Sequence, residues 1–248
     1  MRIYLGVHRF APVAGLEGDM AWLSPQYRRW ITMLRFWNRL IDMDNNRIPK
    51  KLFTNIHGVT LQDDNNWFSC ILKILKFVSL DDAYINVTKV DILECRKRLF
   101  AKQESSWLET VRNKPKLRFF ALFKNTLNAE KYVKINLSSY ERSVLAQIRF
   151  GILKINVETG RYTNTKLEER LCKVCDQNVV EDENHFLFNC DAYDVHRNDW
   201  LEKLYRIRPD LHYLEPNDQL RFIFCEAPRQ TAKFIINSLN IRKDLLYN

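Results

Sequence analysis

Apolar side chains recur at helical spacing in the segment that follows Ser24-Pro25. The apolar residues that each lie three or four positions from another member of the set are Tyr27, Trp30, Ile31, Leu34, Trp37, Leu40 and Ile41. Arginines stand between them, and a proline directly after a serine is typical of a helix start. The pattern predicts an amphipathic helix whose aromatic stripe packs in a core, rather than a platform on which nucleic-acid bases stack.

Similar patterns predict helices along most of the remaining chain. A helix over 67–80 would be capped by Asp63-Asp64-Asn65, and the next, over about 88–112, would end before Pro115. Further helices are predicted over 117–133, 138–150, 191–206, 216–226 and 230–246. The strongest strand candidates are 152–157 and 171–175. We therefore predict a mainly α fold class, a multi-helix domain.

The composition agrees with a folded, helical protein. Of the 248 residues, 46% are hydrophobic and 28% are charged, which excludes a disordered chain. Glycine and proline are scarce, with 6 and 7 residues, whereas an all-β protein needs many tight turns. The length fits one large domain or two small ones. We place a boundary near residue 135, between a helical region over 1–135 and a second helical module over 136–248.

The sequence contains neither a membrane-spanning nor a secretory pattern. No apolar run approaches the ~20 residues of a transmembrane helix, and charged side chains interrupt the N-terminal apolar stretch, unlike a signal peptide. Six cysteines in a chain of this length do not suggest a disulfide framework. We therefore expect an intracellular protein, nuclear or cytoplasmic and not secreted, with no membrane partner.

Positive charge is concentrated in the first half of the chain. The net charge is +9, but residues 1–137 carry +10 and residues 176–220 carry −7. The most basic stretch, 89–124, includes Arg96, Lys97 and Arg98. A basic surface of this kind favours a polyanionic partner such as RNA or DNA, and a solvated helix face is the competing interpretation.

Four metal-ligating side chains follow one another in the C-terminal half. Cys172, Cys175, His185 and Cys190 form the pattern C-x2-C-x9-H-x4-C. Two cysteines with two residues between them can turn both thiolates toward one ion, and four protein ligands are typical of a structural zinc site. The sequence therefore predicts one structural Zn²⁺ that staples a small C-terminal module.

Three other interpretations of these residues are open. The cysteines could be buried free thiols beside a core histidine. The pair Cys172 and Cys175 could be redox-active, although no strand–helix context of the thioredoxin type surrounds it. His196 could replace His185 as the fourth ligand, but His196 lies on the helix predicted after the site, so we favour His185.

Basic residues lead into this cluster and are candidates for contact with nucleic acid. They are Arg142, Arg149, Lys154, Arg161, Lys166, Arg170 and Lys173. Arg142 and Arg149 are seven residues apart and would share one helix face. Together with Arg96, Lys97 and Arg98, these residues predict electrostatic, mostly non-specific binding of RNA or DNA that weakens steeply with salt.

These segments resemble the C-terminal region of non-LTR (LINE-type) retrotransposon reverse transcriptases. The similarity runs through ERSVLAQIRFG (141–151), ETGRYTN (158–164), the C-x2-C pair and EDENHFLFNC (181–190), and more weakly through 5–10, 18–20 and 35–39. The resemblance implies that the cysteines and the histidine bind zinc, and that the region helps to grip template RNA or target DNA. In that family the polymerase and the endonuclease lie upstream of this region.

The sequence lacks the motifs of the usual catalytic sites. A polymerase palm needs carboxylates that bind two metal ions, and the pairs Asp63-Asp64 and Asp81-Asp82 lack its hairpin context. Phosphate-binding glycine loops, H-E-x-x-H and G-x-S-x-G are also missing from the sequence. We therefore expect a non-catalytic nucleic-acid-binding module. The alternatives are a zinc-stabilised protein-interaction or scaffold fragment, which binds a protein partner or self-associates, and an element remnant with no selected function.

Overall fold

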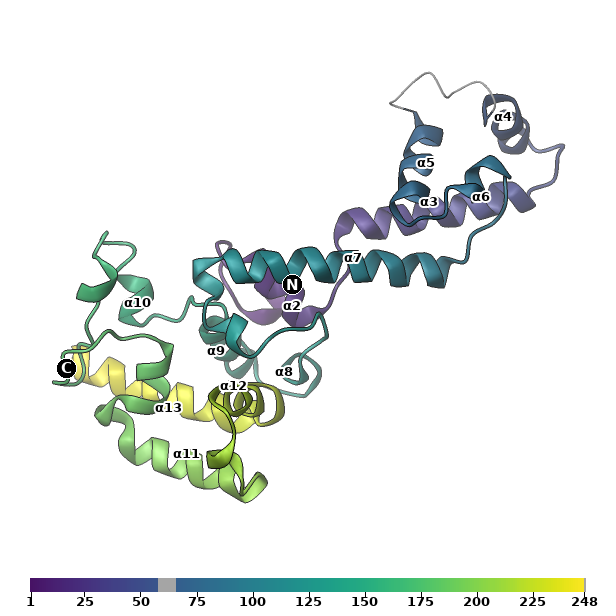
Figure 1. Cartoon of the computed structure of the whole chain (residues 1–248). Coiled ribbons are helices and arrows are strands. Elements are labelled where there is room, and N and C mark those ends of the chain that lie inside the picture. The colour runs from purple at the N-terminus through teal and green to yellow at the C-terminus, as the bar shows by residue number, and fades with distance from the viewer. Residues whose placement is uncertain (58–65, 248) are drawn as a thin grey trace. The chain divides into compact units, whose positions relative to one another are not determined.

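The computed structural model describes residues 1–57 and 66–247, and it shows helices joined by turns (Figure 1). The described residues contain no strand, and one isolated β-bridge joins Leu171 to Val180. A search of the described helices finds none with the length and apolar character that a membrane crossing requires. The predicted mainly α fold class is confirmed.

The chain forms two compact units. Unit 1 comprises Met1–Trp22 and Trp107–Asn248, and unit 2 comprises Leu23–Ser106. The helices of unit 2 are α3 (Pro25–Asp42), α4 (Ile48–His57), α5 (Trp67–Phe77), α6 (Asp82–Ile85) and the first part of α7 (Ile92–Asn113). The remaining α-helices, in unit 1, are α1 (Arg2–Leu5), α2 (Val13–Met20), α8 (Lys131–Lys134), α9 (Ser139–Arg149), α10 (Asn156–Thr159), α11 (Asp194–Ile207), α12 (Pro216–Arg221) and α13 (Pro228–Tyr247). Short 3₁₀ or π turns complete unit 1: η2 (Pro115–Leu117), η3 (Phe120–Leu122), η4 (Leu167–Glu169), η5 (His185–Asn189), η6 (Asp191–Tyr193), η7 (Leu211–Tyr213) and η8 (Phe222–Glu226).

The boundary predicted near residue 135 falls inside unit 1. The N-terminal segment contacts the later half of the chain: the Tyr4 hydroxyl donates to the carbonyl of Val133 at 2.6 Å. The Ser143 hydroxyl donates to the carbonyl of Gly6 at 2.7 Å. Residues 1–22 therefore belong with α9, because their packing partners lie far along the sequence rather than next to them.

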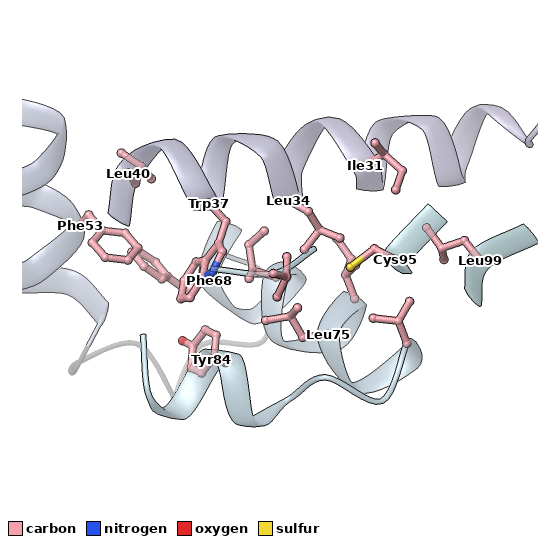
Figure 2. Close-up of a cluster of buried hydrophobic side chains, with 14 residues drawn as sticks. Ile31, Leu34, Trp37, Leu40, Phe53, Phe68, Leu75, Tyr84, Cys95 and Leu99 are labelled. Carbon is pink, nitrogen blue, oxygen red and sulfur yellow. The ribbon is translucent and has the colours of Figure 1, made fainter. Parts of the chain in front are cut away.

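Unit 2 is built around the apolar side of α3. Ile31, Leu34, Trp37 and Leu40 are buried in one cluster with side chains of α4, α5, α6 and α7 (Figure 2). The indole N–H of Trp37 donates to the carbonyl of Thr88 at 3.0 Å, which satisfies the polar group that this ring carries into the core. The buried positions of the predicted stripe are thus core, and Trp37 is inaccessible to a nucleic-acid base.

Three helices begin at residues whose side chains accept a backbone N–H from the residue three positions on. These caps are Ser24 of α3 (3.2 Å), Asn66 of α5 (2.9 Å) and Ser138 of α9 (3.2 Å). The Glu141 carboxylate accepts in return from the N–H of Ser138 at 2.8 Å, which completes a capping box. The starts predicted at Ser24 and Ser138 are confirmed, whereas the proposed cap at 63–65 lies outside the described residues.

Two predicted segments take other conformations. The segment 117–133 is not one helix: it contains the last residue of η2, all of η3 and the start of α8. Between η3 and α8, the buried ammonium of Lys124 donates to the carbonyl of Asn128 at 2.6 Å. The strand predicted over 152–157 is wrong, since α10 begins at Asn156. Of the strand predicted over 171–175, only Leu171 makes a β-bridge. Short apolar runs satisfy either conformation locally, and tertiary packing decides between them.

Helix α9 packs against α1, α8 and α13, and six of its eleven residues are buried. Helix α11 packs against α13, where the rings of Trp200 and Phe234 stack with centroids 4.4 Å apart. The segment from Leu171 to Cys190, which carries the four candidate ligands, connects α10 to this pair of helices (Figure 1).

Candidate metal centre

Cys172 and Cys175 lie on a tight turn. The bridge between Leu171 and Val180 closes the turn, and the N–H of Cys172 donates to the carbonyl of Val179 at 2.8 Å. Asn178 adopts a left-handed backbone with φ 53°, a conformation that asparagine tolerates in turns. The turn therefore holds both thiols on the same side of the chain.

The other two candidate ligands come from η5 and its end. The N–H of His185 donates to a carboxylate oxygen of Asp182 at 2.8 Å, which fixes the start of this turn. The N–H of Cys190 donates to the carbonyl of His185 at 2.8 Å. This hydrogen bond closes the π turn η5 and brings Cys190 close to His185. Both side chains thus face the thiols of the first turn.

The four side chains form one compact group. Their candidate ligand atoms all lie within 4.8 Å of one another. The sulfur of Cys172 is 3.9 Å from the sulfur of Cys190, and the sulfur of Cys175 is 3.4 Å from Nε2 of His185. Cys172, His185 and Cys190 are buried, while Cys175 is half-buried. The predicted set of four is brought together as expected, and it could bind a metal ion.

The thiols of the cluster influence one another. The hydrogen bond with the Cys190 thiol is the chief reason that the pKa of Cys172 is lowered to about 4. The same contact raises the pKa of Cys190 far above its usual range. These opposite shifts favour a thiolate at Cys172 beside a protonated thiol at Cys190. A metal needs both as thiolates, so binding would release this proton.

Buried charged residues that the sequence analysis did not find support the cluster. Arg197, on α11, donates to the carbonyls of Leu187 and Cys190, at 2.9 Å for the first. Glu181 is fully buried, accepts from the N–H of Asn156 at 2.7 Å and pairs with Arg242 of α13. A buried charge needs such partners, and they fix the loop against α10, α11 and α13. No sequence signal separates Glu181 from exposed acidic residues such as Asp176 and Asp191.

The arginines predicted to contact nucleic acid are mostly engaged within the protein, and for Arg149 the prediction is wrong. Its guanidinium is fully buried and donates to both carboxylate oxygens of Asp19, at 2.6 and 2.8 Å, so it cannot reach a phosphate. The guanidinium of Arg142 stacks over the Tyr4 ring, 4.3 Å from its centroid. Arg161 lies 3.2 Å from the Glu158 carboxylate. Arg170 donates to the carbonyls of Thr165 and Val157.

The predicted lysines and the helix α7 candidates are more accessible. Lys154, Lys166 and Lys173 are exposed, with no ion pair to any of the described residues. On α7, Arg96 and Lys97 are exposed, whereas the guanidinium of Arg98 pairs with Glu94 at 2.8 Å.

The fallback ligand His196 is a residue of α11 and is not a member of the four-residue cluster. His185 is therefore the candidate fourth ligand that the structure supports.

Searches against protein-family models, curated proteins and solved structures find no match to this chain.

Proposed function

We propose that this chain is a zinc-stabilised, non-catalytic module that binds RNA or DNA through exposed basic side chains. Its resemblance to the C-terminal region of LINE-type reverse transcriptases points in the same direction. The proposal rests on two features of the described residues: the four-ligand cluster and the unpaired cationic face of α7.

Zinc is the ion whose chemistry fits this cluster. A tetrahedral zinc ion with bonds of about 2.3 Å to sulfur and about 2.0 Å to nitrogen separates two sulfurs by about 3.8 Å, and a sulfur from a nitrogen by about 3.5 Å. The corresponding distances here are 3.9 Å and 3.4 Å. Thiolates select zinc over magnesium and calcium. Four protein ligands leave no open position, so the ion would stabilise the fold rather than supply reaction chemistry.

The observation that carries the binding proposal is the face of α7 in unit 2. Arg96 and Lys97 border one shallow hollow together with the apolar side chains of Leu93, Phe100 and Ala101 and with one acidic residue, Glu104. Neither Arg96 nor Lys97 has a carboxylate partner among the described residues. Free cations beside exposed apolar surface suit a nucleic-acid strand, because the cations meet phosphates and the apolar groups contact bases or sugars.

Two measurements test the proposal. Elemental analysis of the purified protein should find about one zinc per chain, lost in Cys172→Ser. Fluorescence anisotropy with single-stranded RNA and with duplex DNA should show affinity that falls steeply as salt rises. A protein that carries no zinc, or that binds neither nucleic acid at low salt, would contradict the corresponding half of the proposal.

A charge-matched pair of variants tests the α7 face. Arg96→Gln/Lys97→Gln should lower the slope of log affinity against log salt on single-stranded RNA by about 1.4, since each lost phosphate contact contributes about 0.7. The control is Lys203→Gln/Arg206→Gln, which removes the same charge from cations already paired with Asp199 and Glu202 at 2.6 and 2.5 Å. An equal decrease of the salt slope in both variants would show that the α7 face is not the binding surface.

A protein-interaction role is the second candidate. Ile3 and Phe10 are 99% and 68% exposed, and a partner that covers them would remove their apolar surface from water. Light scattering without nucleic acid should then show a mass that rises with concentration, and Ile3→Ser/Phe10→Ser should abolish that rise.

A further inference from the structure

A polar hollow in unit 1 is lined by none of the four candidate metal ligands. It has a volume of about 270 Å³ and is bordered by residues of the 123–134 segment and by the end of α12 with η8. Helix α8 packs directly on η8, which brings these two parts of the chain together (Figure 1). The side chains that matter below are Lys124, Asn125, Lys131, Lys134, Arg221 and Glu226.

The charges at the base of the hollow compensate one another. The buried ammonium of Lys124 pairs with the Glu130 carboxylate and donates to the Asn128 carbonyl at 2.6 Å. Behind it, Arg149 pairs with Asp19 at 2.6 Å and lies 3.6 Å from Glu130. Two cations therefore face two carboxylates, and this buried network contributes no excess charge to the hollow.

The rim of the hollow carries an excess of positive charge. Lys131 pairs with Glu226 at 3.4 Å and donates to its carbonyl at 3.0 Å. That leaves Lys134 and Arg221, which are exposed and have no carboxylate partner in the described part of the chain. The Asn125 side chain, also exposed, adds a neutral amide that can donate hydrogen bonds.

Two uncompensated cations and an amide around one concavity match a small oxyanion. A phosphate group carries one negative charge in a nucleic-acid backbone and about two as the free ion, and the planar guanidinium of an arginine binds two of its oxygens at once. We propose that this hollow binds a phosphate group. Given the proposed function, the source of that group is one phosphate of the bound RNA or DNA strand; only this last step rests on the proposed function.

The test uses the full-length protein and two probes. Inorganic phosphate is titrated into ¹⁵N-labelled protein, and the amide shifts of residues 124–134 and 221–226 are followed. Single-stranded RNA is titrated separately by anisotropy over a salt series. The pocket variant is Lys134→Gln/Arg221→Gln, and the charge-matched control is Lys203→Gln/Arg206→Gln, in which both cations already have carboxylate partners.

We expect saturable phosphate binding in the wild type and in the control, and binding at least about tenfold weaker in the pocket variant, because the variant loses the charge-assisted hydrogen bonds of both cations. The RNA salt slope should fall by about 0.7 in the pocket variant, as for one lost phosphate contact. Phosphate affinity that is equal in the wild type and the pocket variant would overturn the proposal, even if RNA still binds. Phosphate binding in the hollow by a protein that binds no nucleic acid would support the site and refute the proposed function instead.

Discussion

Removing the guanidinium of Arg149 should destabilise unit 1 strongly, although the sequence places this residue among the candidates for nucleic-acid contact. In the structure its side chain is fully buried and makes two hydrogen bonds to Asp19. The ring faces of Phe123 and Phe120 lie within 4.9 and 5.4 Å of its guanidinium carbon. In Arg149→Met, the Asp19 carboxylate would stay buried, and among the described side chains the Tyr132 hydroxyl at 2.6 Å would remain its only direct hydrogen-bond donor.

The expected loss of folding free energy is about 3–5 kcal/mol, the usual cost of leaving one member of a buried ion pair without its partner. Because unit 2 has its own core, the measurement should report on unit 1 alone. Hydrogen exchange of the α9 amides does so, and exchange should accelerate by about a hundredfold or more. The control Lys154→Met, at an exposed lysine, should stay within about 0.5 kcal/mol of the wild type.

A double variant separates the ion pair from simple packing. In Asp19→Asn/Arg149→Met no unpaired carboxylate remains at position 19, so the combined cost should be smaller than the sum of the two single costs by about 1.5 kcal/mol or more. If Arg149→Met behaves like Lys154→Met, the guanidinium is not the buried partner of Asp19, and its proposed role in binding phosphate would return.

Four further predictions concern other parts of unit 1. Cys175→Ser should abolish stoichiometric metal in elemental analysis and remove exchange protection from residues 171–190, whereas a retained ion would show that this thiol is not a ligand. Gly151→Ala should cost more than about 1 kcal/mol in thermal unfolding, because the backbone has φ +61° and the new Cβ would lie 2.2 Å from the carbonyl oxygen of Lys116; a neutral result would contradict the left-handed turn. Ala21→Gly, at the left-handed end of α2 with φ 50°, should instead raise the melting temperature, by the equivalent of about 0.5–1 kcal/mol. Burial acts to raise the pKa of Glu130, but the charges of two neighbouring cations outweigh burial, and the pKa is lowered. The stability that Glu130 contributes is therefore complete above its unfolded pKa near 4.5 and is lost as the pH falls. Glu130→Gln should flatten this loss of stability on the acid side in pH-dependent unfolding.

Features that depend on neighbouring residues could be predicted from the sequence. The starts of α3 and α9 follow from Ser24 and Ser138, since a cap needs only a side-chain oxygen three positions before the N–H that it accepts. The candidate ligands Cys172 and Cys175 are likewise brought together by a turn within one short segment. His185 and Cys190 follow within a short segment, so the spacing of the four residues was enough to predict the cluster.

Features that depend on distant residues were decided by tertiary structure. The spacing of Arg149 along its helix does not distinguish it from an exposed arginine. It forms a buried ion pair only because the N-terminal segment packs beside α9 and brings Asp19 next to it. The same packing places residues 1–22 in unit 1, so the predicted domain boundary near residue 135 falls inside that unit. Lys134 and Arg221 border one hollow because α8 packs on η8. The sequence alone therefore determined the helical class and the candidate ligand set, which arise from local spacing. Burial, charge pairing and the grouping of segments required the folded chain, because each depends on contacts between residues that the sequence keeps far apart.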